Sequence, residues 1–398
     1  MTGIYPLKGT VKHYDWGGTS FLPSLLQIDN KENKPFAEYW MGTHPLGVSL
    51  IDTGNGIEKR LDELAGHLPY LFKAQQVKEM LSIQAHPSKK NAVKEFAREN
   101  AEGIPLNAPY RNYKDDNHKP EMLVALGDFW LLHGFKPEKE LVYTLLNVVE
   151  LRELLPVYNQ SGYSGLYKYV MEMPQEEVNR ILQPLIDHIM PGYLNGSIDK
   201  DDEDFWAARA ALTFNKKPAI GNQQPDIDRG IFSIYLFNLV HLKRGEAIFQ
   251  DAGLPHAYLE GFNVELMANS DNVLRGGLTP KHIDVKELLK HVKCEPTYVD
   301  ILHGKLVNGN ERVYNTPATE FEISLFDLEA GQKASFTPVT TEILLVTEGT
   351  VELESDNKKL QLKKGMPSAV AFPGNIVQIN AISTSTLFRA SVPVNNGE

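Results

Sequence analysis

Residues 341–379 read TEILLVTEGTVELESDNKKLQLKKGMPSAVAFPGNIVQI and hold a series of short apolar runs. The runs occupy positions 341–346, 351–353, 360–362, 369–372 and 376–379, and a further run precedes them at 320–328. Gly349, Gly365 and Gly374 lie between runs, where glycine permits tight turns. Regularly spaced short strands with glycine turns are typical of a jelly roll or sandwich, which we predict for this part of the chain.

Two other patterns of apolar residues precede this region in the chain. Up to Pro137 the chain also alternates short apolar runs with turn residues, apart from HPSKKNAVKEFAREN at 86–100, whose spacing predicts a short helix. Beyond Pro137 apolar residues recur at intervals of three and four, which predicts amphipathic helices. These residues are Leu141, Leu145, Val148, Val149, Leu151, Val178, Ile181, Leu182, Leu185, Ile186 and Ile189. Strand texture returns at 230–240 (GIFSIYLFNLV) and continues to about 272, before a polar connector at 296–317.

These changes of period predict a mainly β protein with a helical insertion. We expect a strand-rich unit from residues 1–137 and 228–308, a helical domain at 138–227, and a second strand-rich unit at 309–398. The two strand-rich units are interpreted as two copies of one barrel type, with the helices inserted in the first.

Composition restricts the class of function. The chain has 398 residues and a formal net charge of -11, and it contains no Lys/Arg-rich stripe, so no nucleic-acid surface is expected. The single cysteine, Cys294, excludes an intrachain disulfide and a cysteine-based zinc site. The N-terminus lacks the apolar core of a signal peptide, and no stretch approaches the roughly 20 apolar residues that span a bilayer. We therefore expect a soluble cytoplasmic protein without a membrane partner.

Two segments in the first strand-rich unit carry polar groups at strand spacing. Ser82, Gln84 and His86 alternate with apolar residues, so they share one face of a strand, either a solvated face or a polar barrel interior. Lys119 and Glu121 flank Pro120, which fits only at the edge or start of a strand. A charged pair at the start of an apolar strand suits a site, although a surface ion pair explains it equally well.

Two later segments are weaker signals when each is taken alone. His256 and Tyr258 share a face in LPHAY at 254–258, where a structural hydrogen-bonded histidine is the simpler interpretation. The stretch 265–281 contains charged residues among turn residues, and such side chains are often only solvated. They are Glu265, Asp271, Arg275 and Lys281.

Taken together, the four segments predict a metal site. Gln84, His86, Glu121 and His256 offer two imidazoles, a carboxylate and an amide oxygen, a set that suits zinc. The absence of thiolates favours a catalytic zinc over a structural one. Because a single carboxylate faces a divalent ion, the metal would stay strongly Lewis-acidic.

The motifs of the whole chain resemble those of the type I phosphomannose isomerases, a family within the cupin superfamily. The resemblance rests on YDWGG at 14–18, AEYWMGTHP at 37–45, LSIQAHP at 81–87, NHKPEM at 117–122, PHAY at 255–258 and ANSDNVLRGGLTPK at 268–281. It implies two cupin-type jelly-roll barrels plus an α-helical domain, with a zinc site in the first barrel. Because all 12 histidines lie at or before His303, we expect the second barrel to bind no metal.

The resemblance also implies roles for individual residues. One zinc per chain would be bound by Gln84, His86, Glu121 and His256, and Arg275 would be catalytic. Substrate-pocket positions match Trp16, Ser82, Lys119, Tyr258, Glu265, Asp271 and Lys281. Of these, Lys119, Glu265 and Asp271 are the candidates for the base, and Lys281 with Ser82 is the expected phosphate anchor.

The implied reaction interconverts mannose 6-phosphate and fructose 6-phosphate through an enediol, in a monomer that binds a sugar phosphate. Such proton transfer next to a carbonyl needs a positioned base and positive charge near the developing oxyanion. Three alternatives stay open: a non-catalytic metal-binding bicupin, a cupin acting on another aldose phosphate, and an iron-dependent cupin oxygenase. The glutamine ligand fits iron poorly, and retention of Arg275 and Lys119 counts against a site without catalysis.

Overall fold

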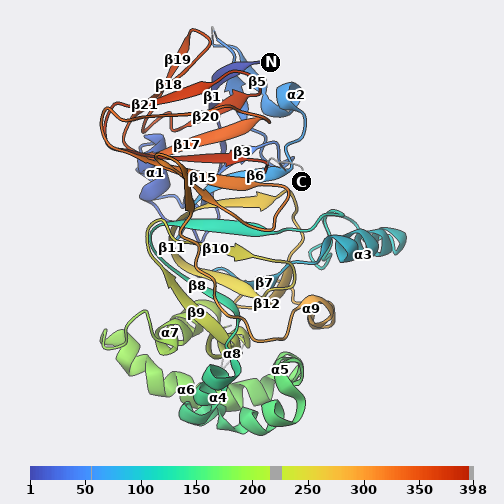
Figure 1. The fold of residues 1–398 in the computed structure, drawn as a ribbon. Helices are drawn as coiled ribbons and strands as arrows, with labels where there is room; N and C mark the ends of the chain where they lie inside the picture. Colours follow the sequence, from blue (N-terminus) through green and yellow to red (C-terminus); the bar gives the residue numbers. More distant parts are fainter. Residues whose placement is uncertain (55, 216–225, 394–398) are drawn as a thin grey trace.

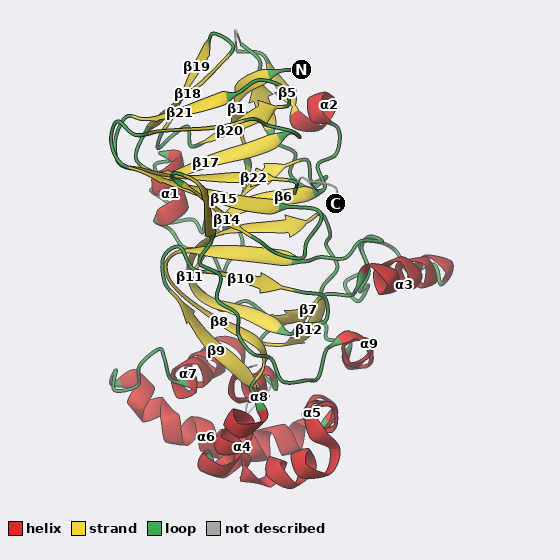
Figure 2. Ribbon diagram, in the orientation of Figure 1, coloured by secondary structure: helices red, strands yellow, loops and turns green. Residues whose placement is uncertain are grey.

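A computed structural model describes residues 1–54, 56–215 and 226–393 of the chain (Figure 1). Two strand-rich regions and a helical region make up the molecule, as the changes of sequence period predicted. Figure 2 shows the strands stacked along most of the molecule, with the helices of the insertion gathered at one end.

The first strand-rich region is a nine-stranded sheet built mostly from antiparallel pairs. Its main path runs through β10 (Ala247–Gln250), β8 (Glu121–Phe135), β11 (His256–Ala268), β6 (Tyr70–Val77), β3 (Glu38–Gly42) and β2 (Thr10–Lys12). Three strands join beside this path: β7 (Ile83–Ala85), β12 (Leu274–Gly277) and β9 (Phe237–Leu242). The long strands β8 and β11 are buried along most of their length, which matches their apolar sequences.

The second strand-rich region contains a nine-stranded and a four-stranded sheet. The larger sheet runs β13 (Lys305–Asn308), β14 (Glu311–Tyr314), β15 (Glu322–Leu328), β22 (Ser385–Ser391), β17 (Glu342–Glu348), β20 (Ser368–Phe372), β1 (Gly3–Lys8), β4 (Leu50–Asp52) and β5 (Glu58–Arg60). The smaller one runs β16 (Lys333–Phe336), β21 (Val377–Ala381), β18 (Val351–Ser355) and β19 (Lys358–Leu362). The strands predicted across 320–379 are therefore present, and the glycines predicted at their turns have positive φ: 76° at Gly349, 91° at Gly365 and 129° at Gly374.

The N-terminal segment contributes to both sheets, which the sequence did not indicate. Strand β1 pairs with β20 from Gly3↔Phe372 to Pro6↔Ala369, so the first residues complete the C-terminal region. Ile4 and Leu7 are buried there, each in a different apolar cluster. A division at residue 308 therefore does not coincide with the boundary between the sheets, because strand pairing joins segments far apart in the chain.

The helical insertion follows β8. It consists of α4 (Glu138–Asn147), a 3-10 helix (Val149–Leu154), α5 (Leu155–Glu172), α6 (Gln175–Leu194) and α7 (Glu203–Phe214). The predicted helix near residue 90 is α3 (Lys89–Ala101), and shorter helices lie at α1 (Phe21–Leu26), α2 (Leu61–Ala65) and α9 (Val285–His291). Part of the expected domain 138–227, residues 216–225, lies outside the described residues.

Two segments differ from their predicted state. The run 230–240 was expected to be a strand, but it forms helix α8 (Gly230–Leu236) and then enters β9. All residues of α8 are buried, and an apolar run without a polar face cannot be assigned to helix or strand from its period. The expected polar connector 296–317 contains the short strands β13 and β14.

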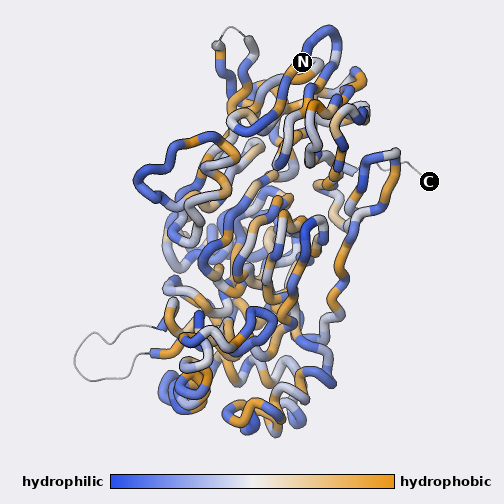
Figure 3. Tube along the Cα trace, turned by 90° about the vertical axis from the view of Figure 1, so that its left-hand side faces the viewer, coloured by the Kyte–Doolittle hydropathy of each residue, from blue (hydrophilic) through white to orange (hydrophobic). Residues whose placement is uncertain are grey.

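A shared core connects the two strand-rich regions. Phe72 and Met122 of the first region and Ile343 and Phe388 of the second belong to one buried apolar cluster. The Tyr70 hydroxyl lies 3.0 Å from the Thr341 carbonyl oxygen and 3.1 Å from that of Ala390. Figure 3 shows hydrophobic residues along the strands of both regions and in the helical end. Within the part of the chain that the structure describes, no helix is both long and apolar enough to cross a membrane.

Candidate metal centre

Strand register brings three of the predicted site residues onto one face of the sheet. His256 at the start of β11 lies opposite Gln84 of β7, and Gln84 lies opposite Arg275 of β12. Directly opposed residues on antiparallel strands point to the same side of the sheet. The alternation in the sequence predicted that Gln84 and His86 share a side, and the pairing adds His256 and Arg275.

His86, Glu121 and His256 form a compact group of potential metal ligands. One ligand atom from each lies within 4.8 Å of the other two, and all three side chains are buried. The Nε2 atom of His256 is 3.3 Å from Glu121 Oε2, and that of His86 is 3.6 Å from the same oxygen. In residues 1–54, 56–215 and 226–393 no other group of three histidine, cysteine or carboxylate side chains has this geometry.

The hydrogen bonds of the two histidines leave the inner nitrogens free. Nδ1 of His86 lies 2.7 Å from the carbonyl oxygen of Asn272, and Nδ1 of His256 lies 2.9 Å from that of Leu254. A carbonyl oxygen only accepts, so each Nδ1 donates its hydrogen and each Nε2 keeps a lone pair. Among the described residues, both Nε2 atoms and Glu121 Oε2 lack a hydrogen-bond partner despite their burial. Such convergent unpartnered acceptors fit a metal ion, and the nitrogen and oxygen donors fit zinc.

Electrostatics favour the protonation states of His86 and Glu121 that a metal needs. Burial lowers the pKa of His86 to about 4, so its imidazole is neutral near pH 7. Burial by itself raises the pKa of the Glu121 carboxyl. Nearby Lys119 and then His86 lower this pKa by more than burial raises it, so the pKa lies well below its usual value. The Lys119 ammonium lies 2.6 Å from Glu121 Oε1, so it neutralises one carboxylate oxygen while Oε2 faces the histidines.

Two adjoining cavities open beside this group. The inner one, of about 200 Å³, is lined by Lys119, Glu121, Tyr258, Glu265 and Asp271 among others. The outer one, of about 580 Å³, is lined by Trp16, Ser82, Arg275 and Lys281 among others. Gln84 lines both cavities. Every predicted site residue therefore has one of two places: it belongs to the buried histidine–carboxylate group, or it lines one of the two cavities.

The outer cavity holds two cations without an acidic partner. Among the described residues no carboxylate oxygen lies within ion-pair distance of Arg275 or Lys281. Burial lowers the pKa of Arg275, and burial together with Arg275 lowers the pKa of Lys281. In a chain of net charge -11, two unpaired cations in one cavity provide a binding place for an anion.

The inner cavity also contains charged residues that sequence analysis missed. Lys73 on β6 lies 2.8 Å from Glu265 Oε2 and 3.6 Å from Glu38 Oε1, and Gln75 donates to both carboxylates at 2.7 Å. Burial lowers the pKa of Lys73, but Glu265 and Glu38 raise it more, so it stays charged. Burial raises the pKa of Glu265 although Lys73 opposes the shift. The sequence contains a pattern that predicts these residues share a strand face: Lys73 and Gln75 alternate with apolar residues in YLFKAQQV at 70–77.

Comparison with known proteins settles the family. A family model of the type I phosphomannose isomerase catalytic domain matches residues 4–138. A mannose-6-phosphate isomerase of Salmonella typhimurium is 37% identical over 96% of this chain and 98% of its own length. The chain belongs to the type I phosphomannose isomerase family. An Escherichia coli relative of the same name is 35% identical over 92% of this chain and 94% of its own length.

Solved structures of the phosphomannose isomerase family share this fold. A zinc-bound mannose 6-phosphate isomerase superimposes with a TM-score of 0.85 at 33% identity, over 98% of this chain and 100% of that one. The Salmonella enzyme bound to substrate (F6P) and zinc gives 0.84 at 34% identity over the same shares. The resemblance read from the sequence motifs and the predicted fold class are thus confirmed.

A buried histidine next to the metal centre, His133, has a shifted pKa that an experiment can test. His133 on β8 lies opposite His256, and its Nδ1 is 3.0 Å from Gln250 Oε1. Burial, and then His256, lower the pKa of His133 from 6.5 to about 4. In the unfolded chain His133 takes up a proton as the pH falls below 6.5, whereas in the folded chain it does so only near pH 4. Between these pH values His133 therefore lowers the free energy of unfolding as the pH falls. From pH 7 to 5 the loss is about 2 kcal/mol.

We expect His133→Asn to remove this pH dependence. Urea unfolding of the metal-free protein at pH 7 and pH 5 measures it for wild type and variant. The free energy of unfolding of wild type should fall by about 2 kcal/mol more than that of the variant, because other titrating groups contribute equally to both. Equal falls would show that His133 titrates normally in the folded chain.

Proposed function

We propose that this chain is a zinc-dependent aldose–ketose isomerase that interconverts mannose 6-phosphate and fructose 6-phosphate. One observation carries the proposal. The unpartnered acceptor atoms of His86, Glu121 and His256 converge beside a cavity that holds two unpaired cations, Arg275 and Lys281. A metal centre next to an anion-binding place suits a phosphorylated substrate whose reacting carbonyl needs polarisation.

Gln84, His86, Glu121 and His256 are proposed to hold one zinc ion per chain. When bound, zinc supplies Lewis-acid polarisation of a substrate oxygen. Neutral His86 and charged Glu121 already have the protonation states for that role. The membership of the family and its zinc-bound relatives support zinc over other metals.

Residues of the outer cavity are proposed to bind the sugar phosphate. Lys281 with the Ser82 hydroxyl anchors the phosphate, and Trp16 covers the same cavity. Arg275 lines this cavity, and its strand position opposes Gln84, one of the proposed ligands. Its guanidinium N–H groups stabilise the negative charge that develops on the substrate oxygen as the enediol forms.

The proton moves between C1 and C2 by way of a group in the inner cavity, where Lys119, Glu265 and Asp271 remain the candidates. Burial raises the pKa of Glu265, which is the direction expected for a carboxylate that accepts a proton. Its Oε1 accepts a hydrogen bond from Tyr258 at 3.2 Å, which orients the carboxylate, and Tyr258 lines the same cavity. Burial raises the pKa of Asp271, but a hydrogen bond from His44 lowers it by more, so the net pKa is below its usual value.

The proposal is tested by isomerase assays before and after zinc removal. Purified protein should convert mannose 6-phosphate to fructose 6-phosphate in a coupled steady-state assay, lose turnover on chelation, and recover it when zinc is added. Glucose 6-phosphate and other aldose phosphates, assayed in parallel, measure specificity. Full turnover in metal-free protein, or zinc binding without any isomerisation, would contradict the proposal, and the second result would favour a non-catalytic bicupin.

Four further expectations from the sequence remain predictions. The division into a catalytic barrel, a helical insertion and a C-terminal metal-free barrel is supported by the grouping of the metal ligands on β7, β8 and β11. We expect the C-terminal barrel to act by packing against the catalytic one through the shared core. A monomeric state and a cytoplasmic location are also expected.

A further inference from the structure

Asn272 makes an unusual number of contacts around the metal centre without facing either cavity. It is fully buried between the site residues Asp271 and Arg275. Its backbone carbonyl oxygen accepts the hydrogen bond from Nδ1 of His86 at 2.7 Å. That bond sets the ring orientation of a proposed metal ligand and the tautomer that frees its Nε2.

The side-chain amide of Asn272 is fully used by the loop that leads into β8. Oδ1 accepts from the backbone N–H of Lys114 at 2.7 Å and of Asp115 at 3.3 Å. Nδ2 donates to the carbonyl oxygens of Asp115 at 2.9 Å and Asn117 at 2.8 Å. Only an uncharged amide of this length offers two acceptor and two donor directions together.

This loop continues directly into the second half of the metal centre. Lys119 and Glu121 follow Asn117 by two and four residues, and Glu121 begins β8. The Asp115 carboxylate also binds back to the Asn272 segment, since it accepts from Ser270 Oγ at 2.8 Å and from the Asp271 N–H at 2.7 Å. The two segments therefore form a closed set of hydrogen bonds.

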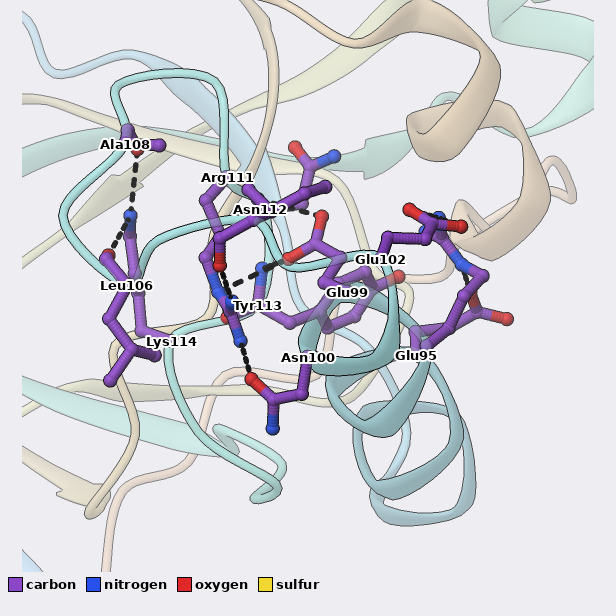
Figure 4. Close-up of polar contacts among 12 residues, drawn as sticks. Glu95, Glu99, Asn100, Glu102, Leu106, Ala108, Arg111, Asn112, Tyr113 and Lys114 are labelled. Atoms are coloured by element: carbon purple, nitrogen blue, oxygen red, sulfur yellow. Dashed lines mark hydrogen bonds and ion pairs between the residues drawn. The ribbon is translucent and has the colours of Figure 1, made fainter.

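The far end of the loop is held independently of Asn272. Figure 4 shows Arg111 and Tyr113 bound to residues at the end of helix α3. Arg111 Nη2 donates to Asn100 Oδ1 at 2.6 Å, and the Tyr113 N–H donates to Glu99 Oε2 at 3.0 Å. Loss of the Asn272 amide would therefore weaken the hold on the part of the loop next to Glu121, where the bonds of Ser270 and Asp271 to Asp115 remain, while the start of the loop stays anchored on α3.

We propose that Asn272 is a positioning residue for the metal centre, acting through both of its polar groups. Its carbonyl orients His86, and its amide holds the loop that places Lys119 and Glu121. One residue thus sets two proposed ligands relative to each other, which narrows the range of geometries that the centre samples without metal. The inference rests on the proposed zinc site, and it assigns Asn272 no contact with substrate.

The test compares zinc affinity between variants of two asparagines in the same loop network. Asn272→Ala removes the amide, and Asn272→Asp keeps its size but replaces the donor by a carboxylate that faces two carbonyl oxygens. The matched control is Asn112→Ala, because Asn112 Nδ2 donates to Asp284 Oδ2 at 2.9 Å and has no bond to the His86 segment. Zinc dissociation constants come from competition with a chromogenic chelator.

We expect both Asn272 variants to bind zinc more weakly than wild type, by about tenfold or more, because without the amide the backbone carbonyl that orients His86 and the loop before Glu121 are both held less firmly. Asn112→Ala should stay within about twofold. Cobalt(II) in place of zinc should give an altered visible absorption spectrum in the Asn272 variants alone, because that spectrum reports ligand geometry.

The outcomes separate this inference from the proposed function. If Asn272→Asp folds and keeps wild-type zinc affinity and cobalt spectrum, Asn272 has no positioning role. The positioning role is equally overturned if Asn112→Ala weakens zinc binding as much, since any disturbance of the network would then suffice. Wild type that binds no zinc, or does not isomerise mannose 6-phosphate, would instead overturn the proposed function.

Discussion

His256→Ala is expected to lower zinc affinity by more than about a hundredfold, beyond the range seen for loss of an outer-shell partner. His256 is fully buried, its Nδ1 is bound to Leu254, and its Nε2 points at Glu121 Oε2 without a hydrogen-bond partner. Alanine removes that nitrogen from the set of converging donor atoms. Isomerase turnover should fall with zinc occupancy, because the remaining ligands hold the metal weakly.

Metal analysis alongside the assay checks this expectation. His188→Ala is the matched control, since this histidine on α6 has 74% of its side-chain surface exposed. The control should keep one zinc per chain and wild-type turnover. Normal zinc content in His256→Ala would remove His256 from the ligand set.

The same measurement counts the metal sites of the whole chain. All 12 histidines lie at or before His303, so the strands from β14 onwards have no imidazole and no cysteine. Acidic residues there are engaged otherwise: Glu348 pairs with Arg244 at 2.9 Å, and Glu352 pairs with Lys359 at 2.9 Å. We expect one zinc per wild-type chain and none after His86 and His256 are both replaced. A transition metal that survives the double replacement would reveal a second site.

Arg275→Ala is expected to reduce kcat by about a hundredfold or more while zinc content stays near one per chain. The guanidinium lies in the outer cavity, opposite Gln84 in strand register, and has no acidic partner among the described residues. Its loss should therefore leave the metal ligands in place and remove charge stabilisation where the oxyanion develops. The magnitude is that of removing one oxyanion donor.

Steady-state kinetics with parallel zinc analysis test the assignment of Arg275. Arg275→Lys should recover only part of kcat, because lysine keeps the charge but lacks the planar fork of donors. Arg312→Ala, at an exposed position on β14, provides a matched control and should behave as wild type. Loss of zinc in Arg275→Ala, or a kcat near that of wild type, would contradict a role confined to the substrate.

Local patterns in the sequence predicted much of the fold. The strand period at 82–86, the helical period after Pro137 and the glycine turns at 349, 365 and 374 all correspond to observed elements. Each of these features depends on side-chain spacing or backbone freedom within a few residues, which the sequence displays directly. The helix at 230–236 was missed because a fully buried run has no polar face to show its period.

The sequence by itself determined which chemical groups the centre has at its disposal. Gln84 and His86 had to share a strand face, and Glu121 had to begin a strand after Pro120. The lack of a second cysteine excluded a site built on several thiolates. These conclusions required only covalent spacing and residue chemistry.

Only the tertiary structure decided which of these groups meet. The register of β11 on β7 set His256 against Gln84, and a shift of one residue would have turned that imidazole to the opposite face. The same long-range pairing buried Lys73 between Glu38 and Glu265, and attached β1 to β20, more than 350 residues later in the chain. Such pairings follow from the burial of whole strand faces against distant partners, so no short stretch of sequence contains them.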